Sequence, residues 1–243
     1  MILYPAIDIM DGQAVRLVEG VFEDATTYHA DPLDAARSWV EAGARFLHVV
    51  DLDGARSGAP KSLDHLRRIV AETGIPIQYG GGLRTVENVR EALRAGAERA
   101  IVGTAAFKDI DFLDDIVAAY GPRVVVAVDV KNGMIATEGW TQTTQLPAVE
   151  AIKRLTGRGL RSFIFTDVSR DGKLTGPDLP AVKDVAQAVR GRFIYSGGIG
   201  TLDHLRSLAQ LRQVNMAGVI AGKSLYEKKF TVAEGQAALD GKA

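Results

Sequence analysis

Short runs of β-branched and apolar residues alternate along the chain with longer segments in which apolar residues recur at helical spacing. The runs predict eight strands, at residues 2–8, 45–53, 75–81, 99–103, 123–130, 161–167, 192–198 and 217–222. Strict alternation of strand and helix is typical of an α/β fold with βα units around a parallel sheet. Eight such units favour a closed (β/α)8 barrel, that is, a TIM barrel.

The segments between the strands are amphipathic, and several follow a helix-capping residue. Asp31, Thr85 and Thr201 each stand directly before such a segment, where a side-chain oxygen can accept from a free backbone N–H. The predicted helices include residues 32–42, 62–72, 86–95, 113–120 and 202–211. Two connections lack a helical pattern, Leu17 to His29 and Gly133 to Gln145. Loops of that length in a compact domain are usually lids or binding loops.

The chain repeats itself at about half of its length. AIDI ends the first strand at Asp8 and AVDV ends the fifth at Asp129, an offset of 121 residues. GGGLRT at 80–85 recurs as SGGIGT at 196–201, an offset of 116, and the other strand ends match at 116 and 119. We therefore expect one domain over residues 1–243, built from two half barrels at about 1–121 and 122–243.

Glycines follow four of the strands, in two matched clusters. A glycine turn before a helix lets backbone N–H groups approach an oxyanion without hindrance from a side chain. Either cluster alone is explained equally well by tight turns, but the matched pair predicts a substrate with a phosphate at each end. The predicted phosphate-binding residues are Gly81, Gly82, Gly103 and Thr104 in one half and Ser196, Gly197, Gly198, Gly222 and Lys223 in the other.

Asp8 and Asp129 each end a strand at the face of the barrel where catalytic residues collect. The repeat places them across the barrel from each other, between the two glycine clusters. Two carboxylates that face one substrate suit proton abstraction at one atom and donation at another, if one is ionised and the other protonated. A structural role for Asp129 would need cationic or N–H partners nearby, and Lys131, which is close in sequence, is one candidate.

Other polar residues at the strand ends are weaker candidates. Asp51, Thr166 and Asp167 are expected to orient substrate hydroxyls or the catalytic carboxylates, although Asp51 is equally suited to cap the loop that follows it. Asp171 fits a turn.

Basic and aromatic residues near the strand ends add further candidates. Arg16 and Arg84 are candidates for contact with a phosphate or carboxylate. Trp140 is a candidate for stacking on a heteroaromatic ring, whereas Trp39 is expected to pack in a helix and His48 in the core.

Composition excludes several classes of function. The chain has 243 residues, 47% of them apolar, and a net charge of −1 without a basic run, so nucleic acid is not an expected partner. It has no cysteine and no cluster of histidines, so no metal site is expected. No apolar run approaches the roughly 18 residues of a membrane span, and no basic leader precedes the first strand. We expect a cytoplasmic monomer with a small-molecule substrate and no membrane partner.

Seven stretches of the sequence resemble the phosphoribosylformimino-5-aminoimidazole carboxamide ribotide isomerases of histidine biosynthesis. They are PAIDIMDGQAVRL (5–17), LHVVDLDGA (47–55), GGGLRT (80–85), VGTAAF (102–107), FTDVSRDGKLTGP (165–177), SGGIGT (196–201) and AGKSLYE (221–227). The resemblance covers nearly the whole chain. It implies an Amadori rearrangement of a bisphosphate, N-(5'-phosphoribosylformimino)-5-aminoimidazole-4-carboxamide ribonucleotide, from an aminoaldose to an aminoketose, without cofactor or metal.

The resemblance also implies roles for single residues. Asp129 corresponds to the general acid that opens the ribose ring, and Asp8 to the general base that removes the proton from the sugar C2. Thr166 corresponds to a residue that assists by hydrogen bonding near the reacting sugar. Gly176 lies in the motif after the sixth strand and joins the expected substrate-binding residues.

Three alternatives are weighed against this interpretation. The cyclase subunit of imidazole glycerol phosphate synthase shares the repeat but typically has a cysteine before the first aspartate, where this chain has Ala6 and Ile7. The dual-substrate isomerase that also serves tryptophan biosynthesis usually has a serine at the position of Gly80 and an arginine at that of Glu138. A glutamate would repel the anthranilate carboxylate, which favours a single-substrate enzyme. A non-catalytic phosphometabolite-binding barrel would need neither Asp8 nor Asp129.

Overall fold

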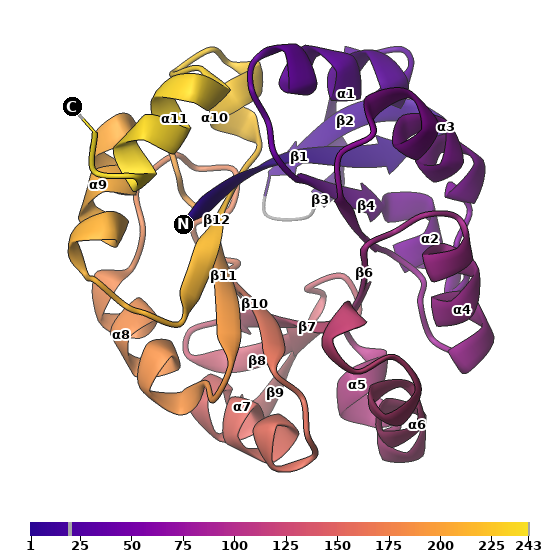
Figure 1. Ribbon diagram of the computed structural model, residues 1–243. Coiled ribbons are helices and arrows are strands. Elements are labelled where there is room, and N and C mark those ends of the chain that lie inside the picture. Colours follow the sequence, from indigo (N-terminus) through magenta and orange to yellow (C-terminus); the bar gives the residue numbers. More distant parts are fainter. Residues whose placement is uncertain (19–20, 243) are drawn as a thin grey trace.

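In the computed structural model, residues 1–18 and 21–242 are described, and among them eight parallel strands form a closed barrel (Figure 1). The barrel strands are β1 (Ile2–Met10), β4 (Leu47–Asp51), β5 (Ile77–Gly80), β6 (Arg99–Val102), β7 (Val124–Lys131), β10 (Ser162–Asp167), β11 (Arg192–Ser196) and β12 (Met216–Ala221). Each pairs in parallel with the next, and β12 pairs with β1, with Leu3 opposite Val219, which closes the ring. The predicted (β/α)8 barrel is confirmed.

Helices surround the strands and cover their outer faces (Figure 1). Asp31, Thr85 and Thr201 cap their helices through side-chain oxygens, as predicted. The helices are α1 (Pro32–Glu41), α2 (Leu52–Ser57), α3 (Leu63–Thr73), α4 (Val86–Arg94), α5 (Ala105–Lys108), α6 (Ile110–Tyr120), α7 (Ala148–Gly157), α8 (Leu179–Ala188), α9 (Leu202–Gln210), α10 (Lys223–Tyr226) and α11 (Val232–Leu239), with one 3-10 turn at Gly121–Arg123. None of the helices in the described part of the chain is long and apolar enough to span a membrane.

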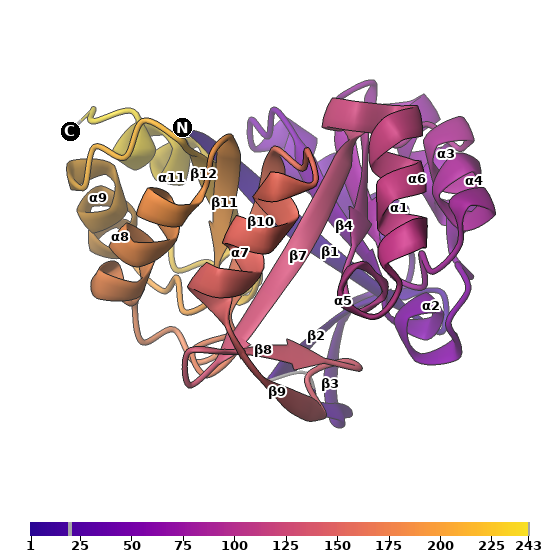
Figure 2. The same ribbon diagram turned by 90° about the horizontal axis from the view of Figure 1, so that it is seen from below.

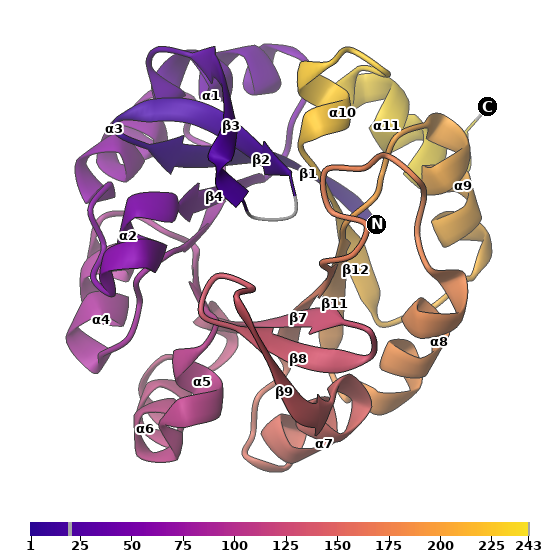
Figure 3. The ribbon, with the colours of Figure 1, turned by 180° about the vertical axis from the view of Figure 1, so that it is seen from behind.

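The two connections expected to be loops are antiparallel hairpins. One consists of β2 (Gln13–Val18) and β3 (Val21–His29), and the other of β8 (Met134–Thr137) and β9 (Gln142–Pro147). Strands β1 and β7 run past the barrel rim, where their free N–H and C=O groups pair with the returning chain. Figures 2 and 3 show both hairpins at the same end of the barrel. This end is therefore walled by two hairpins.

Apolar side chains fill the barrel interior away from this end. The inner cluster is separate from the larger core that lies between strands and helices. Its buried members are Tyr4, Ala6, Phe46, Ile101, Val125, Ile164, Ile194 and Ile220. Four of them, Ala6, Ile101, Ile164 and Ile220, also line the cavity described below. The cluster forms the floor of that cavity.

Candidate active site

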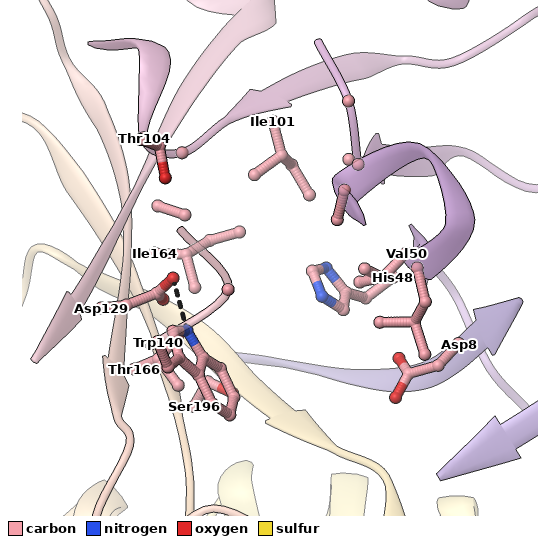
Figure 4. A pocket seen from close by; sticks show the side chains of 18 of the residues that line it. Asp8, His48, Val50, Ile101, Thr104, Asp129, Trp140, Ile164, Thr166 and Ser196 are labelled. Atoms are coloured by element: carbon pink, nitrogen blue, oxygen red, sulfur yellow. Dashed lines mark hydrogen bonds between the residues drawn. The ribbon is translucent and has the colours of Figure 1, made fainter. Parts of the chain in front are cut away.

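A cavity of about 250 Å³ is lined by residues from both halves of the barrel (Figure 4). It is bounded by the strand ends and by residues of the two hairpin loops. Eleven of the candidate residues from the sequence line it: Asp8, Arg16, Gly81, Gly82, Arg84, Gly103, Thr104, Asp129, Trp140, Thr166 and Ser196. A smaller adjoining pocket contains Gly197, Gly198, Gly222 and Lys223, with Arg16 and Ser196 shared between the two.

Asp8 ends the barrel part of β1 and points into the cavity, where it is paired with a buried cation. Its carboxylate accepts a hydrogen bond from Arg16 Nη1 at 2.7 Å, and the residue is 8% exposed. Burial raises the pKa of Asp8 to about 6, although the Arg16 charge acts in the opposite direction. A carboxylate with a pKa near 6 is ionised at neutral pH and retains enough basicity for proton abstraction.

Asp129 lies on β7, across the cavity from Asp8 (Figure 4). The indole Nε1–H of Trp140 donates to its carboxylate at 2.8 Å. Burial raises the pKa of Asp129, and the hydrogen bonds from Trp140 and Thr166 oppose that rise. Lys131, the candidate cationic partner for a structural role of Asp129, is exposed at the end of β7, where the strand has passed the barrel rim. Trp140 and Thr166 are the partners that the structure places on Asp129.

Asp171 is a third acidic side chain of the cavity, and sequence reasoning placed it only in a turn. It does lie in the turn that follows β10, but its side chain lines both pockets. Burial raises the pKa of Asp171, and the charges of Arg16 and Lys223 lower it. The sequence signal for a turn says nothing about the direction of a side chain within it, so only the structure shows this residue in the cavity.

His48 was expected in the core, and this expectation is wrong. The imidazole of His48 lines the cavity, with Nδ1 at 2.9 Å from the side-chain nitrogen of Gln78. Burial lowers the pKa of His48 to about 3, so the ring is neutral at physiological pH. The strand around His48 is apolar on both faces, so its sequence pattern does not show which of its residues face the barrel interior.

The glycine turns of the two half barrels have matching backbone geometry. Gly81 follows β5 with φ of 113°, and Gly197 follows β11 with φ of 110°. A Cβ on Gly81 would lie 2.1 Å from the carbonyl oxygen of Asp51, and one on Gly197 would lie 2.6 Å from that of Asp167. Both positions therefore require glycine, and both turns present backbone rather than side chain to the cavity end of the barrel.

The ends of β6 and β12 carry the second part of each glycine cluster. Gly103 and Thr104 precede α5, while Gly222 and Lys223 lead into α10, and both helices are four residues long. Any side chain on Gly222 would collide with Arg16, because a Cβ there would lie 2.4 Å from its Cζ. The glycine cluster at Gly197, Gly198 and Gly222 thus combines the backbone of its turns with the Lys223 ammonium and the Arg16 guanidinium.

Asp51 does not line the cavity, and the structure assigns it to the alternative role in the loop. The residue is fully buried. Its carboxylate accepts hydrogen bonds from the N–H groups of Gly54 at 2.7 Å and Ser62 at 2.8 Å and from the Tyr79 hydroxyl at 2.7 Å. These bonds, with that from Lys61 N–H at 2.6 Å, occupy its oxygens. The structure thus supports the role of Asp51 in the loop, and binding of substrate by Asp51 stays a prediction.

Asp167 and Gly176 also lie outside the residues that line the two pockets. The Asp167 carboxylate is 3.1 Å from Arg170 Nε. The N–H of Gly176 donates to the carbonyl of Gly198 at 2.8 Å, so Gly176 supports the glycine turn from behind. The predicted direct contacts of these two residues with substrate are not supported.

The rim above the first glycine cluster carries an ion pair. Glu138, at the tip of the β8–β9 hairpin, pairs with Lys108 of α5, and its backbone N–H donates to the Thr104 hydroxyl at 2.9 Å. Arg84, a candidate anion ligand, lines the same side of the cavity. Among the described residues, no group of three or more His, Cys, Asp or Glu side chains is arranged to hold a metal ion.

Comparison with known proteins agrees with this geometry. A family model described as "Histidine biosynthesis protein" matches residues 2–231. The chain is 45% identical over 238 residues, 98% of its length, to the 1-(5-phosphoribosyl)-5-((5-phosphoribosylamino)methylideneamino)imidazole-4-carboxamide isomerase of Roseiflexus castenholzii, of which 99% is covered. Proteins of the same name from Moorella thermoacetica and Syntrophomonas wolfei are 43% identical over 242 residues and 45% identical over 231. These alignments cover 99% and 95% of this chain and 100% and 95% of the two relatives.

Proposed function

The chain belongs to the histidine biosynthesis protein family, and from this membership we propose that it converts the imidazole carboxamide bisphosphate named in its relatives from aminoaldose to aminoketose. The chain is an isomerase of histidine biosynthesis of the aldose–ketose class. The observation that carries the choice of substrate is the pair of glycine clusters on the two sides of one cavity. The name of these relatives contains two phosphoribosyl groups, one for each cluster.

The proposed reaction begins with opening of the ribose ring. The acid Asp129 donates its proton to the ring oxygen while the C1–O bond breaks, and the lone pair of the attached nitrogen forms a protonated imine. Asp8 then removes the proton from C2. The electrons of that C–H bond form a C1–C2 double bond and those of the imine return to nitrogen, which gives an enaminol. Transfer of a proton from the C2 hydroxyl to C1 yields the ketone, so no atom is gained or lost.

Burial raises the pKa of both carboxyl groups, and their partners support this division of roles: the cation Arg16 lies beside Asp8, and the hydrogen-bond donors Trp140 and Thr166 lie beside Asp129. Asp8 has a pKa of about 6 and stays close to Arg16, so its ionised form predominates at neutral pH. Burial raises the pKa of Asp129, which increases the share of the protonated form that an acid requires. Asp171 is the other carboxyl group of the cavity able to act as the acid.

A comparison of two variants tests the choice of acid. With Asp129 as the acid, Asp129→Asn lowers kcat by about 10²-fold or more, and Asp171→Asn lowers it much less. If Asp171→Asn proves the more damaging substitution and Asp129→Asn retains most of the wild-type turnover, Asp171 takes the role of the acid. The barrel, the phosphate sites and the base are unaffected by this outcome.

The surroundings of Gly80 favour the single-substrate enzyme. A Cβ on Gly80 would lie 3.0 Å from Cβ of Ile101 and 3.3 Å from its carbonyl oxygen, so a serine there requires a shift of β6. Glu138 adds a negative charge at the rim, and Lys108 holds its carboxylate there. The charge of Glu138 disfavours a monophosphate that carries an anthranilate carboxylate.

Within this proposal the enzyme acts as a monomer in the cytoplasm. Both half barrels of one chain contribute residues to the two pockets, so a single chain carries both glycine clusters and both aspartates. A doubly phosphorylated substrate remains in the compartment where it is made, because its charges oppose passage through a lipid bilayer.

The function is tested by incubating the purified protein with the bisphosphate aminoaldose and separating substrate and product by chromatography. The expected product has the same mass and a ketose in place of the ribose ring. Tight binding of the bisphosphate without any conversion would contradict the proposal and favour a binding protein.

A further inference from the structure

We propose that Gln78 is a positioning residue whose side-chain N–H holds Nδ1 of His48 as an acceptor, so that His48 presents a neutral Nε2–H to a sugar oxygen in the cavity. The inference rests on the proposed function for the identity of the sugar. Neither residue has a role in the acid–base steps described above.

Strand register puts His48 next to the proposed base. His48 of β4 lies opposite Ala6 of β1, and Asp8 is two residues further along β1, so the two side chains occupy successive layers of the interior. In Figure 4 the imidazole stands between Asp8 on one side and Asp129 with Trp140 on the other. A donor at this place faces the part of the cavity where both carboxylates meet the sugar.

Gln78 lies opposite His48 on the neighbouring strand β5 and is fully buried. Its side-chain nitrogen is 2.9 Å from Nδ1 of His48, and its carbonyl oxygen has no hydrogen-bond partner among residues 1–18 and 21–242. Rotation of the amide would leave both of its N–H groups unpaired, and buried N–H groups without a partner are rarer than under-satisfied carbonyl oxygens. The amide therefore donates, Nδ1 accepts, and the proton of the neutral ring is on Nε2.

The neutral state of His48 protects the base. The charged groups that line the cavity are Asp8, Arg16, Arg84, Asp129, Glu138 and Asp171. Burial and the Arg16 charge both oppose protonation of His48. An imidazolium one layer from Asp8 would stabilise the aspartate anion and lower its pKa, which would weaken it as a base. A neutral N–H supplies a hydrogen bond to the sugar without this effect.

The decisive variant is Gln78→Glu, because a carboxylate accepts hydrogen bonds and does not donate them. It would place the proton of His48 on Nδ1, raise the pKa of the ring and leave Nε2 without its hydrogen. The tautomer is read directly from ¹⁵N NMR of the histidine rings, of which the chain has four. We expect Nε2–H in the wild type and Nδ1–H in the variant.

Activity gives the second measurement. Gln78→Glu should lower kcat by on the order of 10-fold or more, with a smaller change in KM, because one hydrogen bond to the reacting sugar is lost and a tenfold change in rate corresponds to about 1.4 kcal/mol. The titration of His48 should also add a pH-dependent step to the kcat profile. His48→Gln supplies an amide N–H near the position of Nε2. In that background Gln78→Glu should cost much less, which a double-mutant cycle measures.

Gln236→Glu is the matched control. Gln236 is also buried, 6% exposed, but its hydrogen bonds are to Leu3, Met1 and the Asp240 carboxylate, away from the cavity, so the control also includes repulsion from Asp240. Its thermal unfolding measures the cost of a buried carboxylate apart from any effect on the sugar. If Gln78→Glu does not fold, Gln78→Met takes its place. This variant should lower kcat strongly while the Tm of unfolding changes little.

An Nδ1–H tautomer in the wild-type protein overturns the inference, whether or not the enzyme turns over the bisphosphate. Wild-type kcat and pH profile in a folded Gln78→Glu or Gln78→Met also overturn it, while the proposed function stands. Absence of turnover in the wild type, with the Nε2–H tautomer present, contradicts the proposed function alone.

Discussion

The guanidinium of Arg16 on β2 lies 2.7 Å from the carboxylate of Asp8 on β1, and the two side chains are 10% and 12% exposed. The β2–β3 hairpin thus places a cation beside Asp8. Burial raises the pKa of this carboxylate, and the charge of Arg16 lowers it. The pairing sets the pH range in which Asp8 acts as a base, and it makes the hairpin part of the site. Each of the following predictions depends on contacts of this kind.

The pH dependence of the reaction should report Asp8. In the wild type kcat/KM should fall as pH decreases through about 6, because the base becomes protonated. Arg16→Met removes the charge that lowers the pKa of Asp8, so the fall should begin at higher pH. A pH–rate profile on both proteins measures the shift, with Arg158→Met, an exposed arginine of another ion pair, as control. An unchanged profile for Arg16→Met would contradict the assignment.

Asp8→Asn should abolish most of the turnover and spare binding. The asparagine keeps the shape of the side chain and loses the proton acceptor, which typically costs 10²–10⁴-fold in rate. Steady-state kinetics measure kcat, and calorimetric titration with the product measures affinity, which should change much less. Near wild-type turnover would show that another residue is the base.

Trp140→Phe should raise the pKa of the acid, Asp129. The indole N–H donates to Asp129 and lowers its pKa, so its loss raises that pKa further. Activity is lost at high pH because the acid becomes deprotonated, and in the variant this loss should begin at a higher pH than in the wild type. In addition, kcat should fall by about 10-fold because the hydrogen bond is lost. Trp39→Phe is the matched control, since Trp39 packs against Tyr226 and does not line the cavity. Equal effects of the two substitutions would speak against a role for Trp140 at Asp129.

Both glycine clusters should bind a phosphate of the same substrate molecule. A crystal structure with the bisphosphate product should show one phosphate at the turns around Gly81 and Gly103 and the other at those around Gly197 and Gly222. Lys223→Met should weaken binding, because it removes one of the cations of the second cluster, and the change in Kd is measured by titration. Occupation of one cluster only, with the second phosphate elsewhere, would refute the paired sites.

Phosphoribosylanthranilate should be a poor substrate. It has one phosphate, so one cluster stays empty, and its carboxylate has to approach the rim where Glu138 is held by Lys108. Comparison of kcat/KM on the two substrates measures the preference, and Glu138→Gln should reduce it by removing the repulsion. Comparable values for the wild type would contradict the single-substrate assignment and leave the barrel and the aspartates in place.

Local features of the chain determined most of the fold and the outline of the site. The alternation of strand and helix and the caps at Asp31 and Thr201 depend on neighbours in sequence, and the half-length repeat is a match between two parts of the sequence, so all three are visible without the structure. The glycine turns and the strand-end aspartates are local in the same sense. Their place at the carboxyl end of the barrel follows from the fold class.

Tertiary structure decided which side chains meet. Barrel strands are apolar on both faces, so periodicity does not reveal that His48 faces the cavity, and a turn motif does not show that Asp171 does. Strands β1 and β7 extend beyond the rim of the closed barrel, where their backbone groups lack a parallel neighbour. The hairpins form because the returning chain pairs with these groups. Pairing of β4 with β5 brings the Tyr79 hydroxyl to Asp51, whose carboxylate also accepts from the N–H groups of Gly54 and Ser62 in the loop that follows it. Hydrogen-bond partners far apart in sequence compete for each polar group, and their distances are set only when the barrel closes.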